Sequence, residues 1–476
     1  MALAKTDPII IVGAGVFGLS TALHLGRRGY TDVTIFDSQP YDKTLYSYFE
    51  GCDAASADMN KIIRAGYGKD TVYQDLTLES VAGWTAWNDE LHAGKTVPPG
   101  MTKTDSVWVN NTAISMTDAD TLPNFELDSI ESMPAGTMLV STDAKDCATA
   151  KAKGFNMEQF ARQTPGKPNV FVLDTTGGFA CADKACRFAL HKARSYGVKT
   201  VFGPVAGKIV DLVYKPGTGD VTGITTADGK THLAVLTVMA CGGWTPTLVP
   251  SLDGLNETTA GSVALLKIPR SSPYWDKLAP ENFPTFMHKL RDGEPGGLYG
   301  FPRHESGWFK IGYRGTKYTN PQVQKDGKER SVPVTRWTEG DKITSIPATA
   351  LRVIQKFLDE YLPGLGASGI HISKTRICWY NDSFDNHLTI DHVPNAAGLM
   401  VATSGSGHAF KYLPSLGNWV VDIIEGVGLD RPAVKAWKWR SLGAAKPFNV
   451  IMAGSKGPRA LQNVPLVPET SMHAKL

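Results

Sequence analysis

Three glycines and an aspartate near the start of the chain have the types and the spacing that binding of a dinucleotide requires. Gly13 can form a tight turn after the apolar run at residues 9–12. Gly15 leaves room for a pyrophosphate, and Gly18 lets the following helix lie against the strand. Asp37 follows about twenty residues later, where a ribose hydroxyl needs an acceptor. The spacing therefore predicts a nucleotide site, with a tight strand–turn–helix that holds no ligand as the alternative.

An open α/β sheet is the architecture that would position these residues. The runs at 9–12 and 33–36 are rich in β-branched residues, which is typical of buried parallel strands. A helix between them would present free N–H groups and a positive dipole end to an anion. The same alternation returns at residues 177–240 and at 399–426, where strand-like runs flank helical ones. We therefore predict one α/β sheet whose strands come from separate parts of the chain.

The intervening regions have a different pattern. Residues 101–174 are polar and strand-rich, and the stretch 142–153 within them has the composition of a surface excursion. The pattern of residues 260–340 predicts antiparallel strands that are separated by Pro and Gly, and a helix is predicted at 348–362. Residues 437–476 are rich in Pro and Gly, and we expect them to lie over the surface. The predicted fold class is α/β, with a second region of α+β type.

Composition and charge exclude several classes of protein. The 476 residues suffice for two or three domains with large cores, and the hydrophobic content of 42% is that of an ordinary globular protein. The net charge of +3 comes without a dense Lys/Arg stripe, so we expect no nucleic-acid partner. No apolar run approaches the roughly 18 residues that cross a bilayer, and the start lacks the order of a signal peptide. We expect a soluble, intracellular protein without a membrane partner.

The six cysteines are too few in so long a chain to form a disulfide framework. No Cys-x-x-Cys or His-x-x-x-His spacing indicates zinc, and we assign no metal site. Cys181 and Cys186 lie near the start of a predicted helix, where buried thiols are the usual explanation.

Four stretches together resemble the FAD-dependent amine oxidases, a family that includes fungal amadoriases (fructosyl amino acid oxidases), sarcosine oxidases, and pipecolate and saccharopine oxidases. The stretches are the glycine loop continued to Leu25, residues 60–64 (NKIIR), 378–380 (CWY) and 404–411 (SGSGHAFK). They keep the family's order over nearly the whole chain. The resemblance implies a Rossmann-like FAD-binding domain that is interleaved in sequence with an antiparallel-sheet substrate domain. The implied segments are 1–92, 178–248 and 384–476 for FAD, and 93–177 and 249–383 for the substrate.

The resemblance also implies how FAD is held. The cysteine at the position of Cys378 carries the flavin as a thioether in this family, and a buried structural cysteine is the alternative. Trp379-Tyr380 and residues 391–394 (DHVP) keep the same register, which favours the covalent link. The positions assigned to FAD are Gly13, Gly15, Val16, Phe17, Gly18, Asp37, Ser38, Lys61, Val205, Gly242, Trp244, Cys378, Gly405, Gly407, His408, Phe410 and Lys411.

Three basic residues receive catalytic roles from the same resemblance. Arg64 and Lys411 match the positions that hold the substrate carboxylate in sarcosine oxidases, one as a bidentate fork and one as a point charge. Lys310 matches the lysine that assists oxygen, since a cation in a low-dielectric pocket stabilises superoxide. The alternatives are a surface helix position for Arg64 and an exposed strand face for Lys310.

The signals for the subgroup disagree. Residues 410–418 and 437–440 resemble amadoriases, which oxidise sugar-modified amino acids. Amadoriases carry an Asp-Glu pair shortly after the oxygen lysine, whereas this chain has Tyr313-Arg314. Arg64 and Tyr380 are instead similar to the sarcosine and pipecolate oxidases. Arg314 could pair with a second carboxylate, such as that of saccharopine or another dicarboxylic secondary amine.

These observations predict a FAD-dependent oxidase of a secondary amine or N-substituted amino acid, as in sarcosine, pipecolate or saccharopine oxidation. The imine product hydrolyses, and O2 is reduced to hydrogen peroxide. The alternatives are a fructosyl amino acid oxidase and, in another class, a FAD dehydrogenase that passes electrons to a protein acceptor. A flavin-bound protein without catalysis is a further alternative, disfavoured because the whole set of residues is present.

The end of the chain bears on location. Ala474-Lys475-Leu476 is a conservative variant of the Ser-Lys-Leu peroxisomal address. If hydrogen peroxide is a product, a location beside catalase is reasonable. We therefore expect a peroxisomal protein, which acts as a monomer.

Overall fold

The computed structural model describes residues 3–52, 54–160, 166–289, 296–340, 342–442 and 449–469. Its first sheet has six strands in the order β22-β23-β13-β1-β2-β9. The strands are β1 (Ile9–Val12), β2 (Val33–Asp37), β9 (Lys199–Phe202), β13 (Leu236–Met239), β22 (Thr389–His392) and β23 (Leu399–Thr403). Neighbouring strands are parallel except at the edge, where β22 runs antiparallel to β23.

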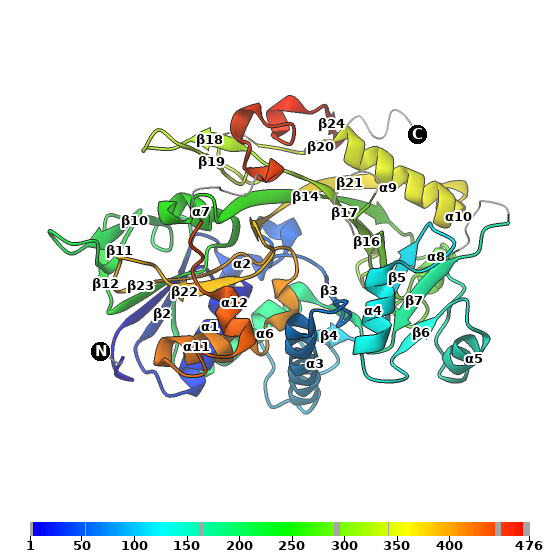
Figure 1. Cartoon of the computed structure of the whole chain (residues 1–476), viewed down its shortest axis with the longest axis horizontal. Coiled ribbons are helices and arrows are strands. Elements are labelled where there is room, and N and C mark those ends of the chain that lie inside the picture. The colour runs from blue at the N-terminus through cyan, green and yellow to red at the C-terminus, as the bar shows by residue number, and fades with distance from the viewer. Residues whose placement is uncertain are drawn as a thin grey trace.

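The central strand β1 shows why this sheet needs apolar residues in succession. Ile9 and Ile11 pack into the core that holds α1 (Val16–Arg27), α6 (Ala182–Ser195) and α11 (Leu416–Glu425). Ile10 and Val12 pack on the opposite face, where a three-stranded sheet lies. Its strands are β10 (Ile209–Tyr214), β11 (Val221–Thr226) and β12 (Thr231–Leu233). Because both faces are covered (Figure 1), all four residues of β1 are buried.

The second large sheet has eight strands in the order β21-β14-β17-β16-β15-β5-β7-β6 and is mostly antiparallel. The strands are β5 (Ala113–Thr117), β6 (Met138–Val140), β7 (Val170–Asp174), β14 (Asn256–Lys267), β15 (Thr285–His288), β16 (Leu298–Gly300), β17 (Trp308–Tyr318) and β21 (Ile372–Ser383). Ile354 and Phe357 of α9 (Ala348–Tyr361) pack into one core with Phe309 and Ile311 of β17. One face of this sheet is thereby closed, and the other face is left for a site.

Shorter elements complete the chain. The helices are α2 (Tyr41–Thr44), α3 (Thr71–His92), α4 (Asn124–Ser132), α5 (Ala144–Ala152), α7 (Thr245–Leu248), α8 (Tyr274–Lys277), α10 (Pro363–Ala367) and α12 (Pro432–Trp437). The small sheets pair β3 (Lys61–Ile63) and β4 (Trp108–Val109) with β8 (Gly178–Ala180), β18 (Pro321–Val323) with β19 (Glu329–Ser331), and β20 (Ser345–Pro347) with β24 (Leu466–Pro468). Short 3-10 turns lie at Tyr48–Glu50, Gly242–Trp244, Pro250–Leu252, Ala409–Tyr412, Val450–Met452, Gly454–Lys456 and Leu461–Asn463.

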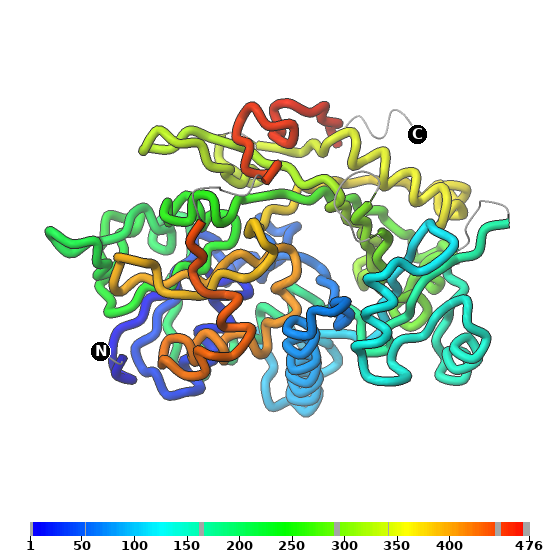
Figure 2. The backbone as a smooth tube through the Cα atoms, in the orientation of Figure 1, coloured from blue at the N-terminus to red at the C-terminus, as the bar shows by residue number. Residues whose placement is uncertain are grey.

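The predicted fold class is confirmed, since a parallel α/β sheet and an antiparallel sheet coexist. The stretch 142–153 contains helix α5, and the region after residue 437 adds strand β24 to β20. Figure 2 shows blue, green and orange segments, which are far apart in the sequence, lying together at one end of the molecule. Every strand of the six-stranded sheet comes from the segments 1–92, 178–248 and 384–476. The domain boundaries themselves stay a prediction, and Ala474-Lys475-Leu476 lie outside the described residues.

Two absences hold for the residues that the structure describes. No helix there combines the length and the hydropathy that crossing a membrane requires. Within the same ranges, no group of three or more His, Cys, Asp and Glu side chains is arranged to bind a metal ion.

Candidate active site

One cavity of about 450 Å³ is lined by residues of both large sheets. Gly13, Asp37 and Gly242 line it where β1, β2 and β13 end. Arg314 and Tyr380 line it from β17 and β21 of the eight-stranded sheet. A crevice outside the carboxyl ends of parallel strands is the usual ligand position in open α/β folds.

The glycine turn is built for close approach of backbone. Gly13 has φ +105°, and a Cβ there would lie 2.3 Å from the carbonyl oxygen of Ala240. A Cβ on Gly18 would lie 1.8 Å from the carbonyl oxygen of Gly13, so only glycine lets α1 dock on β1. Gly15 lines the cavity, and its Cβ would lie 3.1 Å from the Oγ of Ser56. The turn therefore leaves a concave cradle at the N-terminus of a helix, which suits a pyrophosphate.

Asp37 ends β2 and braces the same turn. Its Oδ2 accepts a hydrogen bond from the backbone N–H of Ala14 (2.7 Å), and its Oδ1 accepts one from Gln39 (2.8 Å). Burial raises the pKa of Asp37 to about 6, against the lowering effect of both N–H donors. The carboxylate still has lone pairs for a hydroxyl, because each oxygen accepts more than one bond.

Strand alternation decides which side chains of the eight-stranded sheet face the cavity. Successive residues of a strand point to opposite faces. On β17, Phe309, Ile311 and Tyr313 belong to the core with α9, so Lys310, Gly312 and Arg314 share the opposite face. On the corresponding face of β21 lie Arg376, Cys378 and Tyr380.

Two glycines make room on that face. A Cβ on Gly312 would lie 2.1 Å from the ring of Tyr299, so this ring occupies the space above β17. The hydroxyl of Tyr380 lies 3.4 Å from where Gly261 would carry a Cβ. That hydroxyl is buried, and no hydrogen-bond partner for it exists among the described residues. A buried polar atom without a partner at the wall of a cavity indicates a ligand.

Cys378 is buried, lines the cavity and is a free thiol. It packs with Met59, Val263 and Leu265 in a small apolar cluster. Its neighbours two residues away on the strand are Arg376 and Tyr380, so the thiol lies between a cation and the unpartnered hydroxyl.

Two cations meet at the ring of Tyr67. Lys411 Nζ donates to the hydroxyl of Tyr67 and to the carbonyl oxygen of Arg64, both at 2.9 Å. The guanidinium carbon of Arg64 lies 5.1 Å from the centre of the same ring, and Lys411 Nζ lies 4.6 Å from it. Burial lowers the pKa of Lys411 well below its usual value, and the charge of Arg64 lowers it further. Both side chains line the cavity.

Arg314 adds a third cation to this end of the cavity. It donates to the carbonyl oxygens of Gly407 and Ser406, both at 3.2 Å. Burial alone would lower the pKa of Arg314, but the neighbouring Tyr380 and Asp382 raise it. Among the described residues that line the cavity, the only carboxylate is that of Asp37.

The turn at residues 404–407 carries these carbonyl groups in a strained conformation. Ser404 and Ser406 have φ of 59° and 45°, values that are unusual for residues other than glycine. Asn381 holds the turn, since its Oδ1 accepts from Ser404 N (3.0 Å) and its carbonyl oxygen accepts from Ser406 N (2.9 Å). Strain of this kind persists only where the surroundings fix it.

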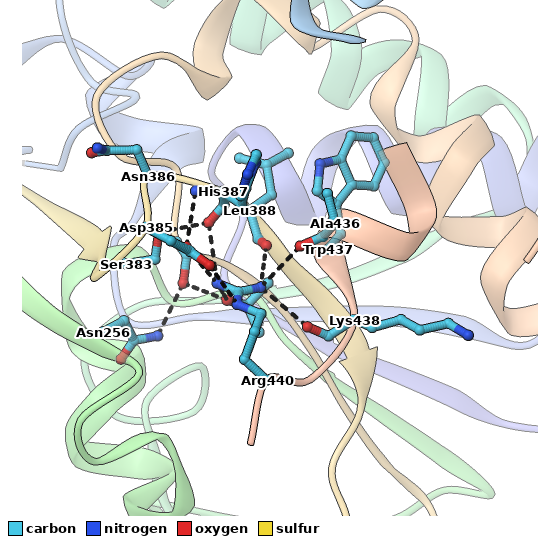
Figure 3. A network of polar contacts seen from close by, with 12 residues as sticks. Asn256, Ser383, Asp385, Asn386, His387, Leu388, Ala436, Trp437, Lys438 and Arg440 are labelled. Carbon is cyan, nitrogen blue, oxygen red and sulfur yellow. Dashed lines mark hydrogen bonds and ion pairs between the residues drawn. The ribbon is translucent and has the colours of Figure 1, made fainter. Parts of the chain in front are cut away.

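Arg440 is the centre of a polar network (Figure 3) that reaches the turn through Thr389, whose Oγ1 accepts from Arg440 (3.1 Å) and donates to Oγ of Ser404 (2.9 Å). Arg440 pairs with Asp385 (Nε–Oδ2 3.1 Å) and donates to the carbonyl oxygen of Leu388 (2.7 Å). Asp385 and Leu388 belong to the loop between β21 and β22. In this loop the carbonyl oxygen of Asn386 accepts a hydrogen bond from Nε2 of His408 (3.1 Å). Burial lowers the pKa of His408 to about 3, so the ring is neutral where it lines the cavity.

Lys310 lies next to the cavity and does not line it. Its Nζ pairs with Asp58 (2.9 Å), donates to the carbonyl oxygen of Asn60 (2.8 Å) and lies 4.5 Å from the ring centre of Phe301. Phe301 and Lys61 line the cavity beside it. Burial lowers the pKa of Lys310 to about 7, although the charge of Asp58 opposes this effect.

Most of the predicted site residues lie around this one cavity. The lining includes Gly13, Gly15, Val16, Phe17, Asp37, Ser38, Lys61, Arg64, Gly242, Trp244, Arg314, Cys378, Tyr380, Gly405, Gly407, His408, Phe410 and Lys411. Gly18 and Lys310 stand directly behind it. Val205 lies outside the lining and is 56% exposed, whereas Gly207, Lys208 and Ile209 line the cavity nearby.

Sequence reasoning missed several residues of the site, and three of them bear on its chemistry. Asp58 pairs with Lys310, and Tyr299 and Met287 line the cavity from β16 and β15. Alternation along β17 predicts that Lys310 and Arg314 lie on the same face of the strand. It does not predict which strands lie beside β17 in the sheet. Asp58 lies 252 residues before Lys310, and β15 pairs with β5 from much earlier in the chain, so no local pattern specifies these contacts.

The chain matches a family model described as FAD dependent oxidoreductase over residues 8–423. The chain belongs to the FAD-dependent oxidoreductase family. The match covers both large sheets, including the glycine turn, Lys310 and Cys378.

Curated relatives of the chain are amine oxidases. It is 26% identical to L-saccharopine oxidase of Schizosaccharomyces pombe over 91% of this chain and 93% of that one. It is 22% identical to monomeric sarcosine oxidase of a Bacillus species over 87% of this chain and 92% of that one. These relatives confirm the resemblance to FAD-dependent amine oxidases.

Solved structures similar to this one include Amadoriase II, the fructosamine oxidase of Aspergillus fumigatus. The TM-score is 0.75 at 26% identity, and the alignment covers 98% of each chain. The residues of this structure fit FAD, because the cradle at Gly15 can take a pyrophosphate, and Cys378 and the unpartnered Tyr380 hydroxyl border the same cavity.

Proposed function

We propose that the protein is a FAD-dependent oxidase of secondary amino acids whose N-substituent carries a second acidic group. The observation that carries this proposal is the charge at one end of the cavity. Arg64, Lys411 and Arg314 all line that end, and the one lining carboxylate among the described residues, Asp37, belongs to the nucleotide turn. Lys411 is buried and the two arginines are half-buried, so the three charges favour an anionic ligand, because a desolvated cation without a counter-charge is costly.

Arg64 and Lys411 are suited to hold the α-carboxylate of an amino acid. Both approach the ring of Tyr67, and the lowered pKa of Lys411 would rise again once a carboxylate lay beside it. A guanidinium gives two parallel hydrogen bonds to a carboxylate, whereas an ammonium acts as a point charge. This grip would fix the orientation of the carbon that is to be oxidised.

Arg314 is suited to hold the second acidic group. It reaches the cavity from β17, and its hydrogen bonds to Gly407 and Ser406 go to carbonyl oxygens, which do not neutralise its charge. L-saccharopine oxidase, one of the relatives, is named for a substrate class that fits this arrangement. Sarcosine oxidase is named for a smaller secondary amino acid, which would leave Arg314 without an anion.

FAD, when bound, would take up a hydride equivalent from the C–H bond beside the amine nitrogen, which leaves a C=N bond, and would pass the two electrons on to O2. Cys378 would hold its flavin end covalently, and the turn at Gly13–Gly18 would hold its pyrophosphate. Tyr380 would donate its free hydroxyl toward the substrate or the ring system. Lys310, buried behind Phe301, would supply positive charge where O2 becomes reduced to hydrogen peroxide.

A fructosyl amino acid oxidase is the second candidate, and one observation favours it: the TM-score of 0.75 to Amadoriase II. Arg314 argues against this candidate. By resemblance, amadoriases carry an acidic residue at this position, which would bind either the sugar hydroxyls or a charged side chain of the substrate. The activity of a protein with the same fold is a weaker guide to substrate than the charges that line the cavity.

The deciding experiment is anaerobic flavin reduction by a panel of substrates, followed by peroxide release in air. We expect saccharopine and related dicarboxylic secondary amines to reduce the flavin faster than sarcosine, pipecolate or fructosyl-glycine. A preference for fructosyl amino acids would establish the second candidate. Flavin reduction without peroxide release would indicate a dehydrogenase with a protein acceptor.

Exchange of Arg314 provides the matched test of the second acidic group. Arg314→Glu should reverse the preference for acidic over plain N-substituents, because it reverses the local charge. Arg314→Lys keeps the charge and should retain most of that preference. Equal effects of both variants on all substrates would mean that Arg314 supports the turn at Gly407 and does not read the substrate.

We also propose that the protein acts as a monomer, which is supported by the name of its relative monomeric sarcosine oxidase. Light scattering coupled to size-exclusion chromatography tests this directly, and a mass of about 51.4 kDa is expected.

A further inference from the structure

Asp58 connects three cations beside the cavity. Its Oδ2 accepts from Nζ of Lys61 and from Nζ of Lys310 (2.9 Å), and its Oδ1 lies 3.4 Å from the guanidinium of Arg376. Its Oδ1 also accepts from the backbone N–H of Met59 (2.8 Å). We call Asp58, Lys61, Lys310 and Arg376 the Asp58 cluster.

The cluster joins the elements on which the proposed chemistry depends. Lys310 comes from β17, Arg376 from β21 and Lys61 from β3. Arg376 is two residues before Cys378 on the same face of its strand, and Lys61 lines the cavity. Asp58 therefore lies between the strand of the proposed oxygen lysine and the strand of the proposed flavin attachment.

The cluster is buried and carries excess positive charge. The side chains of Asp58, Lys310 and Arg376 are at most 4% exposed. Burial alone would raise the pKa of Asp58, but the charges of Lys310, Lys61 and Arg376 lower it well below its usual value. Asp58 therefore stays ionised at any pH at which the protein is studied.

Lys310 has few other partners that could keep it charged. The carbonyl oxygen of Asn60 and the ring of Phe301 face its ammonium from the segment before β3 and from the end of β16. His304, in the turn before β17, is neutral because burial lowers its pKa to about 4. Lys61 and Arg376 repel the ammonium, so among the groups that face it Asp58 is the one with an opposite charge.

We propose that Asp58 is a positioning residue for oxygen reduction, which fixes the direction of the Lys310 ammonium and keeps it protonated near neutral pH. The inference rests on the proposed role of Lys310. Asp58 gives up no proton. Reduced FAD supplies two electrons and two protons, O2 takes them up, and the products are oxidised FAD and hydrogen peroxide. The charge that Asp58 secures on Lys310 acts on the oxygen while it is negatively charged.

The test is the pH dependence of flavin reoxidation by O2 in the wild-type holoenzyme and in Asp58→Asn. Protonated Lys310 is the active form, so the rate should be high at low pH and fall as pH rises through the pKa of Lys310. Loss of the opposing charge lowers that pKa, so the fall should move to lower pH and the rate at pH 8 should drop about tenfold. The rate constant for anaerobic reduction of the flavin by substrate should differ by less than about threefold between the variant and the wild type.

Matched variants separate this inference from the proposed function. Lys310→Met should remove the pH-dependent fall, and Asp58→Asn should add nothing to the double variant. If Lys310→Met leaves reoxidation unchanged, the role of Lys310 fails and the inference fails with it. If Lys310→Met slows reoxidation while Asp58→Asn leaves the pH profile unchanged, only the inference about Asp58 is overturned. Asp422→Asn is the control. It removes a carboxylate of α11 that pairs with Arg28, away from the Asp58 cluster, and should leave the pH profile of reoxidation unchanged.

A second readout does not depend on turnover. The absorption spectrum of the oxidised flavin, recorded across the same pH range, should shift as the charge of Lys310 is lost, and at lower pH in Asp58→Asn. If Asp58→Asn yields no folded flavoprotein, Asp58→Glu decides. It keeps the charge and moves the carboxylate, so reoxidation should slow by about fivefold or more without a shift of the profile. Unchanged reoxidation in Asp58→Glu would overturn the positioning role.

Discussion

Side chains alternate between the two faces of β21, and this alternation puts Cys378 on the face that borders the cavity. On β21 it shares a face with Tyr380, and both line the cavity. If it carries the flavin, denatured and precipitated wild-type protein should stay yellow, and Cys378→Ala should release its flavin on denaturation. The measurement is the absorbance of the washed pellet and of the supernatant. A colourless wild-type pellet with free FAD in solution would make Cys378 a structural cysteine.

Lys310 offers the second prediction at the residue scale. Lys310→Met keeps the bulk of the side chain and removes its charge, so flavin reoxidation should slow by orders of magnitude. Loss of one preorganised charge is worth about 3 to 4 kcal/mol in such sites. Stopped-flow measurement of both half-reactions checks this, with flavin reduction by substrate as the internal control. Equal slowing of both half-reactions would indicate a general structural role.

The third prediction at the residue scale concerns Arg64. Arg64→Ala removes one of the two cations at the ring of Tyr67, so an amino acid should bind about a hundredfold more weakly. The measurement is the dissociation constant from anaerobic titration of the flavin. Arg64→Lys should lose less, because it keeps the charge and gives up only the bidentate geometry. Simple amines without a carboxylate should be equally poor substrates of the wild type and the variant.

The candidate site was predictable where chemistry lies in short motifs. The glycine turn, Arg64, Cys378 and Lys411 all lie in contiguous stretches, and all of them line the cavity. Asp58 escaped notice because its partners Lys310 and Arg376 lie more than 250 residues away, on two strands of the eight-stranded sheet. A carboxylate among apolar neighbours has no local signature that distinguishes a buried ion pair from a surface residue.

At the scale of elements, strand existence was predictable and strand pairing was not. The apolar runs at 9–12, 33–36 and 399–403 predicted β1, β2 and β23, because parallel strands buried on both faces need continuous apolar residues. The register of β14 against β21 joins Gly261 to Cys378, a pairing over more than a hundred residues. That register decides that glycine, and not a side chain, stands beside the thiol and the hydroxyl of Tyr380.

The docking of α1 on β1 gives a prediction at this scale. Gly18→Ala would place a Cβ 1.8 Å from the carbonyl oxygen of Gly13, so the helix must move away from the turn. We expect a loss of about 1–3 kcal/mol in the free energy of unfolding, together with weaker FAD retention. The measurements are denaturant unfolding and the flavin-to-protein absorbance ratio. Gly366→Ala is the control, since a Cβ there meets nothing within 4 Å. Similar losses in both variants would contradict the tight-contact explanation.

At the scale of the whole molecule, the chain passes repeatedly between two sheets that share one ligand cavity. Composition and periodicity indicated an interrupted α/β sheet, but only the family resemblance implied that the two regions interleave. The physical reason is that hydrophobic patterning specifies which face of an element is buried and not which distant element covers it. Residues that line the cavity, such as Gly13 and Arg314, belong to different sheets, so a bound dinucleotide would contact both.

That arrangement predicts how FAD affects the stability of the whole molecule. In Cys378→Ala the cofactor can be removed and added back, so free FAD should stabilise the folded state by mass action, by about 2.7 kcal/mol at a hundredfold excess over the dissociation constant. Because FAD would contact both sheets, melting followed by far-UV circular dichroism and by tryptophan fluorescence should shift together. NAD is the control, since it offers the pyrophosphate turn the same group but has no flavin for the face of β21. If NAD stabilised the variant as much as FAD, or if FAD shifted one signal and not the other, the cavity would not be a FAD site that spans both sheets.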